Sequence, residues 1–465
     1  MKTQPVARSQ TDMWPGIFTG FMGVWLGFVV FKLGNPVILD DWVRLTPVGA
    51  PAAWLGGAGT APVDQSLQGT GLLDFLFHPV SFVWGLYSLG MLLLLGLKAG
   101  RWQISAPRWL IGLPAAWLVW QVLAWTQSVD AVLSNATLAH FAACVVCFYL
   151  GLFVLGQTRS WRLFWASLTV GFLLVLWVAF TQHYGGLEQI RRELYEQPNW
   201  QQFPAELTKR VTSGRVFGTM IYPNALAGLI LILLPPTLVA VTRLSWNLPR
   251  VARGVIVGLL AYSGLACLVW SGSKAGWLIG LGMLVILLFR LPLPRTLKWL
   301  SLGAVLVVGL ATFSIRYARY FERGATSVSA RMDYWQAAWQ TALRHPALGT
   351  GPGTFSIAYR ARKTPESEMT RLCHNDYLEQ ASDSGLMGFL LYTGFFPGTL
   401  AYLYRKRGGN QDWMLFCTWL GLAGWAAQGM VEFGLYIPAL AWPAFTLLGW
   451  LLGLGTRGNG IDNPR

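Results

Sequence analysis

The sequence is poor in charged residues and in cysteine. Only 12% of its 465 residues are charged, whereas 54% are hydrophobic. A soluble domain of this length needs more charge to cover its surface, so the composition excludes an ordinary water-soluble enzyme. Among five cysteines only Cys373 is expected in an external loop, which excludes an extracellular disulfide pair. Cys144 and Cys147 lie among apolar residues, and we interpret them as packing residues.

The sequence contains many long apolar runs. Each is roughly 17 to 20 residues long, which as a helix crosses about 30 Å of hydrocarbon. A helix satisfies its own backbone in lipid, so the sequence predicts an all-α integral membrane protein with about 12 transmembrane helices. The expected spans are 16–31, 80–97, 109–125, 138–155, 163–181, 222–241, 254–270, 276–289, 299–314, 385–404, 413–428 and 437–454.

Positive charge is distributed unevenly along the chain. The whole formal net charge of +15 falls on one set of connections together with the two chain ends. In bacterial inner-membrane proteins the short cytoplasmic loops carry the excess of Lys and Arg. We therefore expect cytoplasmic N- and C-termini in the inner membrane, with the other connections in the periplasm. The cations are scattered and do not form one patch, so no nucleic-acid partner is expected.

Residues 1–465 are expected to form one polytopic membrane domain with three longer periplasmic segments. These segments are 32–79, 182–221 and 315–384. The last is expected to be the main catalytic loop. Within it, apolar residues at helical spacing over 329–345 predict an amphipathic helix on the bilayer surface. Residues 348–355 are rich in glycine and predict a flexible turn.

The most specific pattern lies where the last segment re-enters the membrane. There the pair His374–Asn375 precedes two spaced glycines within residues 374–388. This stretch resembles the signature of the O-antigen ligase superfamily, which includes O-antigen ligases, polysaccharide polymerases and O-linked oligosaccharyltransferases. Residues 215–224, and 331–335 with the glycine-rich turn after them, are similar to the same family. The resemblance covers roughly the C-terminal half and implies a fold like that of the GT-C glycosyltransferases.

The resemblance implies transfer of a glycan from undecaprenyl diphosphate to an acceptor hydroxyl. Such a reaction needs a base for the hydroxyl and cations for the departing diphosphate. His374 is the predicted base, since a neutral imidazole accepts a proton near working pH. Arg215 and Arg331 are the predicted diphosphate ligands, because a guanidinium binds phosphate oxygens through two donors. The further candidates for substrate binding are Lys274, Asn224, Asn375 and Tyr377.

The sequence supports further expectations for Lys274, Asn375, Asp376 and Glu432. Lys274 stands where relatives have arginine, so a point charge replaces a bidentate fork. Asn375 or Asp376 is expected to cap the following helix, which places His374 near a helix N-terminus. Glu432 is expected to be no more than an acid in an external turn between the last two spans.

The predicted function is a metal-independent, inverting transfer on the periplasmic face. The expected partners are an undecaprenyl-diphosphate-linked glycan donor, the lipid A core or another glycan as acceptor, and membrane lipids. No cofactor is expected, and no His and carboxylate spacing forms a metal-ligand motif. A polysaccharide polymerase or a protein O-oligosaccharyltransferase needs the same base and cations and stays an open alternative. A polyprenyl-glycan flippase predicts charges deep within several spans, and these spans have almost none.

Overall fold

The computed structural model describes residues 13–39, 80–100, 106–158, 161–196, 208, 212–322, 326–365, 367–407 and 412–455. These residues form helices and the turns between them and contain no β-strand. The α-helices are α1 (Met13–Lys32), α3 (Phe82–Ala99), α4 (Arg108–Trp125), α5 (Ala131–Phe153), α6 (Arg162–Thr181), α7 (Leu187–Glu196), α9 (Pro223–Leu244), α10 (Arg250–Trp270), α11 (Lys274–Arg290), α12 (Arg295–Glu322), α13 (Thr326–Arg344), α14 (Phe355–Arg360), α15 (Asp376–Arg407), α16 (Trp413–Gln428) and α17 (Pro438–Gly455). Shorter helical turns are η4 (Leu155–Gln157), η5 (Gln182–Gly186) and η7 (Gly434–Tyr436).

Each predicted span coincides with one of these helices. The fold class predicted from the apolar runs, an all-α integral membrane protein, is therefore confirmed. Within the described residues, eight helical segments are long and apolar enough to cross a membrane. Helices α11 and α16 are shorter, with 17 and 16 residues, and the count of 12 spans stays a prediction.

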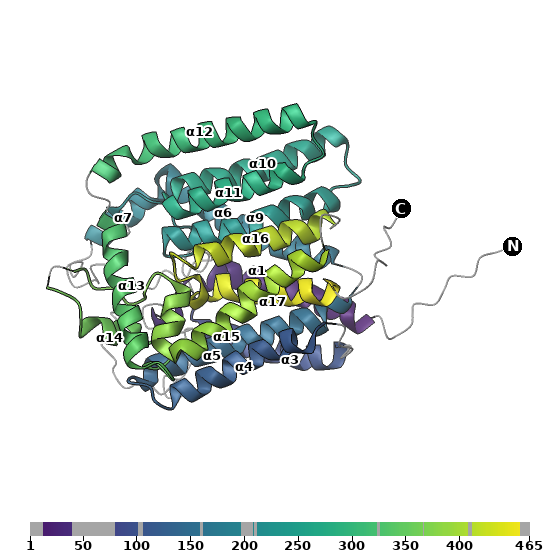
Figure 1. Ribbon diagram of the computed structural model, residues 1–465. Helices are drawn as coiled ribbons and strands as arrows, with labels where there is room; N and C mark the ends of the chain where they lie inside the picture. Colours follow the sequence, from purple (N-terminus) through teal and green to yellow (C-terminus); the bar gives the residue numbers. More distant parts are fainter. Residues whose placement is uncertain are drawn as a thin grey trace.

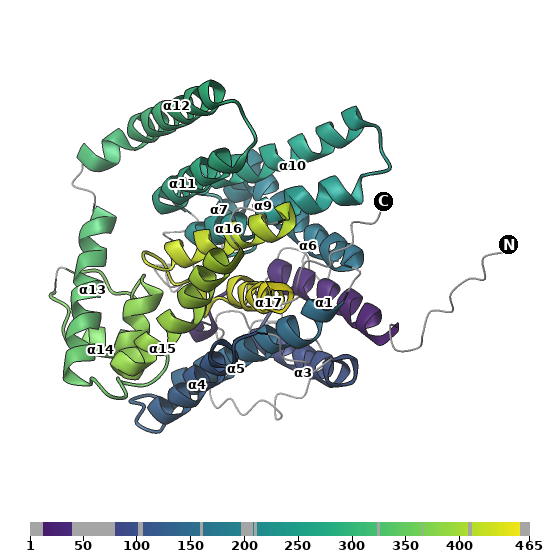
Figure 2. The same ribbon diagram turned by 45° about the vertical axis from the view of Figure 1, so that its right-hand side comes forward.

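Helix α17 lies at the centre of the bundle, as Figure 2 shows. Its residues are apolar on every side, and a helix of that kind is stable only when other helices surround it. It packs most closely on α5, where Gly151 lies against the carbonyl of Thr446 and Gly449 against that of Phe148. A side chain at either glycine would overlap the facing backbone, so small residues set this close approach.

Helix α15 bends where it enters the bundle. The backbone leaves helical geometry at Ser384 and at Gly385, whose φ is 73°. The glycine-rich turn packs against this bend: Thr350 N donates to Ser382 O at 3.1 Å and Gly351 N donates to Asp383 O at 2.9 Å. Residues 349–355 are buried. The prediction of a flexible turn was wrong, because these backbone hydrogen bonds fix the glycines against α15.

The amphipathic helix predicted over 329–345 is present as α13, whose ends lie within a few residues of the predicted ones. It runs across one end of the bundle (Figure 1). A face of small residues, including Ala338 and Ala342, is buried, whereas Met332, Trp339 and Leu343 are exposed. Small α14 and α7 lie at the same end, and the start of α1 and the end of α17 lie at the other (Figure 1). Contact of the exposed apolar stripe with the bilayer surface stays a prediction.

The three predicted external segments are described to different extents. Most of 32–79 lies outside the described residues. The second contains η5, α7 and the residues that lead into α9. The third begins inside α12, because this helix continues to Glu322 beyond the predicted end of its span. Helix α12 packs chiefly on α11 and lies at the outer edge of the bundle in Figures 1 and 2.

Candidate functional site

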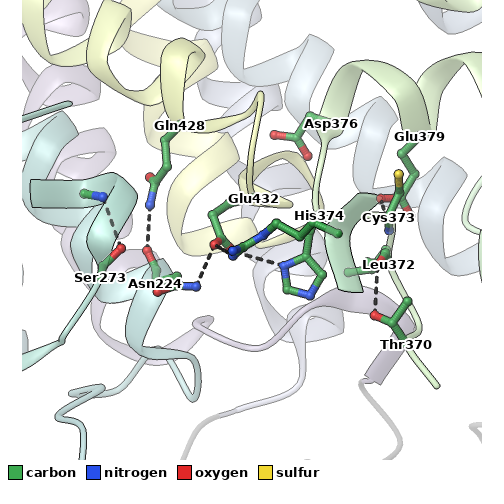
Figure 3. Close-up of polar contacts among 12 residues, drawn as sticks. Asn224, Ser273, Thr370, Leu372, Cys373, His374, Asp376, Glu379, Gln428 and Glu432 are labelled. Atoms are coloured by element: carbon green, nitrogen blue, oxygen red, sulfur yellow. Dashed lines mark hydrogen bonds and ion pairs between the residues drawn. The ribbon is translucent and has the colours of Figure 1, made fainter. Parts of the chain in front are cut away.

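The carboxylate of Glu432 joins four segments that are far apart in the sequence. It lies in the turn after α16, and the residue is 5% exposed. Its Oε1 accepts hydrogen bonds from Asn224 Nδ2 at 2.6 Å and from Arg331 Nη2. Its Oε2 lies 3.2 Å from Nδ1 of His374. Figure 3 shows Asn224 and His374 directed at Glu432 from opposite sides. Glu432 is therefore the hub of the candidate site.

Two buried residues hold the turn that carries Glu432. The carboxylate of Asp376 accepts from Leu435 N at 3.1 Å, and Asp376 N donates to Gly429 O at 2.7 Å. On the other side, His140 Nδ1 accepts from Trp442 Nε1. The proton of His140 is thus on Nε2, which donates to Leu435 O at 2.7 Å. Contacts on both sides of Leu435 fix the turn and with it the Glu432 carboxylate.

His374 is held at the start of α15 in an uncommon conformation. Its φ is 55°, in the left-handed region that side chains rarely occupy. Asn375 Oδ1 accepts from the backbone N–H groups of Tyr377 and Leu378, so the predicted helix cap is present. The ring of Phe433 packs edge-on against the imidazole with centroids 4.7 Å apart. The His374 side chain remains 23% exposed.

Arg215 is anchored on the opposite side of the hub. Its Nε donates to Ser271 O and its Nη2 to Asn224 Oδ1, both at 2.7 Å. Gly272 lies directly against this guanidinium with φ 60°, and a Cβ there would come within 3.2 Å of Arg215 Nε. Glycine is required at this position by both its conformation and its neighbour.

Lys274 is the first residue of α11, behind the cap that Ser273 Oγ forms by accepting from Gly276 N. Its ammonium lies 3.7 Å from the ring centroid of Tyr320 on α12. Burial lowers the pKa of Lys274, and the charges of Arg215 and Arg331 lower it further. A helix N-terminus favours anions. A cation placed there beside two arginines therefore leaves an unbalanced positive charge.

The charges of the site leave capacity for an anion. Burial alone would raise the pKa of Glu432, but Arg331, the His374 hydrogen bond and Arg215 together hold it below the usual value. Glu432 is thus ionised at neutral pH. Burial lowers the pKa of Arg215, and Glu432 opposes that effect. Arg215, Arg331 and Lys274 outnumber this one carboxylate, so the site attracts negatively charged ligands.

The structure brings most of the predicted site residues together, but not all. Arg215, Asn224, Arg331 and His374 are linked through Glu432, and Lys274 joins them electrostatically. The Tyr377 hydroxyl instead donates to Ala426 O at 2.8 Å, between helices α15 and α16. The Asn375 side chain is occupied by its capping bonds. Substrate contacts of these residues stay predictions.

The expectation that Glu432 is a simple external turn acid was wrong, because its side chain is buried. Gln428 was also missed; its Nε2 donates to Asn224 O at 2.8 Å and supports the same network. One signal was available in the sequence. Glu432 is the only acid between Asp412 and Asp462, and it lies in a short turn between two apolar spans. An isolated ionisable group in such a place indicates a specific partner.

Comparison with known proteins gives one result beyond the geometry. No curated protein matches the chain. One protein-family model does match, over a segment that runs from α10 into α15. This segment includes Lys274, Arg331 and His374, whereas Arg215, Asn224 and Glu432 lie outside it. The family model described as O-Antigen ligase matches residues 258–393, and the predicted resemblance to this family is therefore confirmed.

Proposed function

We propose that the protein transfers a glycan from undecaprenyl diphosphate to a hydroxyl of the lipid A core on the periplasmic face of the inner membrane. The family match supports a membrane glycosyltransferase of the ligase or polymerase type. One observation carries the finer proposal. The buried carboxylate of Glu432 contacts His374 and Arg331 and interacts with the charge of Arg215, and the charges of both arginines act in turn on Lys274.

The cations provide the diphosphate site in this proposal. Arg215 and Arg331 each bind protein oxygens through Nη2, and each has further N–H donors in its planar fork. The Lys274 ammonium faces aromatic rings, which leaves its charge available to an anion. Cations with a helix N-terminus beside them form a favourable phosphate site. The departing diphosphate gains negative charge in the transition state, so these groups stabilise it more than the bound donor.

His374 removes the proton of the acceptor hydroxyl. Because Glu432 is ionised, it accepts a hydrogen bond from Nδ1–H, which leaves the lone pair on Nε2 for the incoming proton. The acceptor oxygen forms a bond to the anomeric carbon while the bond from that carbon to the diphosphate oxygen breaks. Glu432 then stabilises the imidazolium cation. Direct attack from the side opposite the leaving group inverts the anomeric centre.

Glycan transfer by purified protein in nanodiscs tests the proposal. The reaction contains a lipid-linked glycan donor and lipid A core, and wild type is compared with His374→Ala. His345→Ala is the matched control, since His345 is an exposed histidine after α13 with no place in the site. Transfer by wild type and the control, with a loss of at least about a hundredfold in His374→Ala, is expected.

The same assay separates the alternatives. Undiminished transfer by folded His374→Ala would remove this histidine from the mechanism. Extension of one lipid-linked glycan by another, without transfer to lipid A core, would identify a polymerase. Transfer to serine or threonine of a protein would identify an oligosaccharyltransferase.

A further inference from the structure

Four aromatic side chains form a cluster where helices α6 and α10 end. The aromatic cluster consists of Phe180, His183, Tyr184 and Trp270. The His183 imidazole stacks on the Trp270 indole with centroids 3.8 Å apart and planes 9° from parallel. Phe180 and Tyr184 pack edge-on against the same indole, at 4.8 and 5.8 Å. His183 and Tyr184 are exposed, Tyr184 by 71%.

An irregular turn places these rings. Helix α6 continues into the π-helical turn η5, where Tyr184 and Gly185 leave helical geometry and Gly185 has φ 115°. Such turns inside helices are frequent at functional sites. The side chain of Gln182 fixes the turn, because its Oε1 accepts hydrogen bonds from Phe217 N at 3.1 Å and from Gly218 N at 2.8 Å. The exposed rings are therefore held against the loop that carries Arg215.

The backbone of Trp270, a cluster residue, contacts the loop that carries Arg215. Val216 N donates to Trp270 O at 3.2 Å, and the next carbonyl, that of Ser271, accepts from Arg215 Nε. The other end of the guanidinium binds Asn224, and through Asn224 and Glu432 it is connected to His374. In this chain of contacts Arg215 lies between Trp270 of the aromatic cluster and His374.

The order of groups in the reaction assigns a ligand to each side. In an in-line displacement the acceptor oxygen, the anomeric carbon and the diphosphate oxygen lie in sequence. The sugar must then lie between His374 and the cations, and the lipid attached to the diphosphate must leave on the far side of them. The exposed rings of the aromatic cluster lie at the ends of helices α6 and α10, beside the loop that carries Arg215.

We propose that the aromatic cluster binds the first isoprene units of the donor's polyprenyl chain. The proposal rests on the function proposed above and adds the residues that select the lipid. Flat, exposed rings offer apolar contact to an unsaturated hydrocarbon at the depth where the diphosphate meets the bilayer. Rings at helix ends also serve as plain anchors in the headgroup zone. An anchor would not distinguish one phosphate ligand from another, and this difference is measurable.

The experiment compares a diphosphate that carries a prenyl chain with one that carries no hydrocarbon. Binding of farnesyl diphosphate and of inorganic pyrophosphate is measured for the full chain in nanodiscs. The variants are Tyr184→Ala and His183→Ala, made separately. The matched control is Trp246→Ala, because Trp246 is also 71% exposed but lies in the loop between α9 and α10 at the other end of those helices. Thermal unfolding of each variant verifies the fold.

Wild type and Trp246→Ala are expected to bind farnesyl diphosphate more tightly than pyrophosphate. In each cluster variant that preference falls about tenfold, the effect of losing contact with roughly two methylene groups, while pyrophosphate affinity is unchanged. An unaltered preference in both variants, or equal weakening of both ligands, overturns the proposal. If wild type binds pyrophosphate and does not prefer farnesyl diphosphate, the lipid-binding proposal is overturned and the proposed function is not. Wild type that binds neither diphosphate overturns the proposed function as well.

Discussion

The Nδ1 atom of His374 lies 3.2 Å from Oε2 of Glu432, although the two residues belong to different turns of the chain. A carboxylate in this position fixes the orientation and the tautomer of the imidazole. In Glu432→Gln the shape is kept and the charge is lost. We expect the maximal transfer rate to fall roughly a hundredfold, with a smaller change in the donor KM. Steady-state kinetics in nanodiscs measure both.

Glu188→Gln serves as the control for this variant, since Glu188 pairs with Arg191 on the exposed helix α7. Wild-type kinetics in Glu432→Gln would show that the carboxylate does not act on His374.

The depressed pKa of Glu432 predicts a pH dependence of stability. Its pKa in the folded protein is below the value of about 4.3 expected in an unfolded chain. The stabilisation by its ion pairs is therefore fully present above about pH 4.3 and is lost as the pH falls through the lower folded-state pKa. Thermal unfolding of wild type and Glu432→Gln between about pH 6 and pH 3 measures this contribution. Parallel curves for the two proteins over this range would contradict the prediction.

Replacement of Gly272 is predicted to weaken both the fold and the donor site. In Gly272→Ala the left-handed backbone costs roughly 1–2 kcal/mol, and the new Cβ pushes on the Arg215 guanidinium. We expect a lower Tm and weaker donor binding. Gly258→Ala is the control, because no atom lies within 4 Å of a Cβ added there. Equal behaviour of the two variants would show that Arg215 tolerates displacement.

Substitutions of Asn375 can show whether its side chain only caps helix α15 or also binds substrate. Asn375→Ala removes the acceptor for the N–H groups of Tyr377 and Leu378 and should destabilise the protein by about 1 kcal/mol. Asn375→Ser keeps an acceptor and should restore both stability and transfer. If stability returns while transfer does not, the amide itself binds substrate, as the sequence first indicated.

Sequence reasoning located the helices because apolar runs and cation-rich connections are local signals. It also selected His374, Arg215 and Arg331, because the motifs that contain them are compact, and the structure places all three around Glu432. Their roles in transfer stay predictions. Sequence reasoning could not find Glu432 at the hub, because the partners of this residue come from three distant segments and only folding assembles them. The glycine-rich turn was misjudged for the same reason. Its order comes from the backbone of α15, which is not a neighbour in sequence.

The position of α17 has a consequence for how the protein is made. The helices it packs against, α1 and α5 among them, precede it in the chain. During synthesis these helices are therefore made before their central partner, and their faces toward α17 have no protein partner until it is inserted. The bundle can close only after α17 is inserted. The contacts of Glu432 with His374 and Asn224 are therefore completed late.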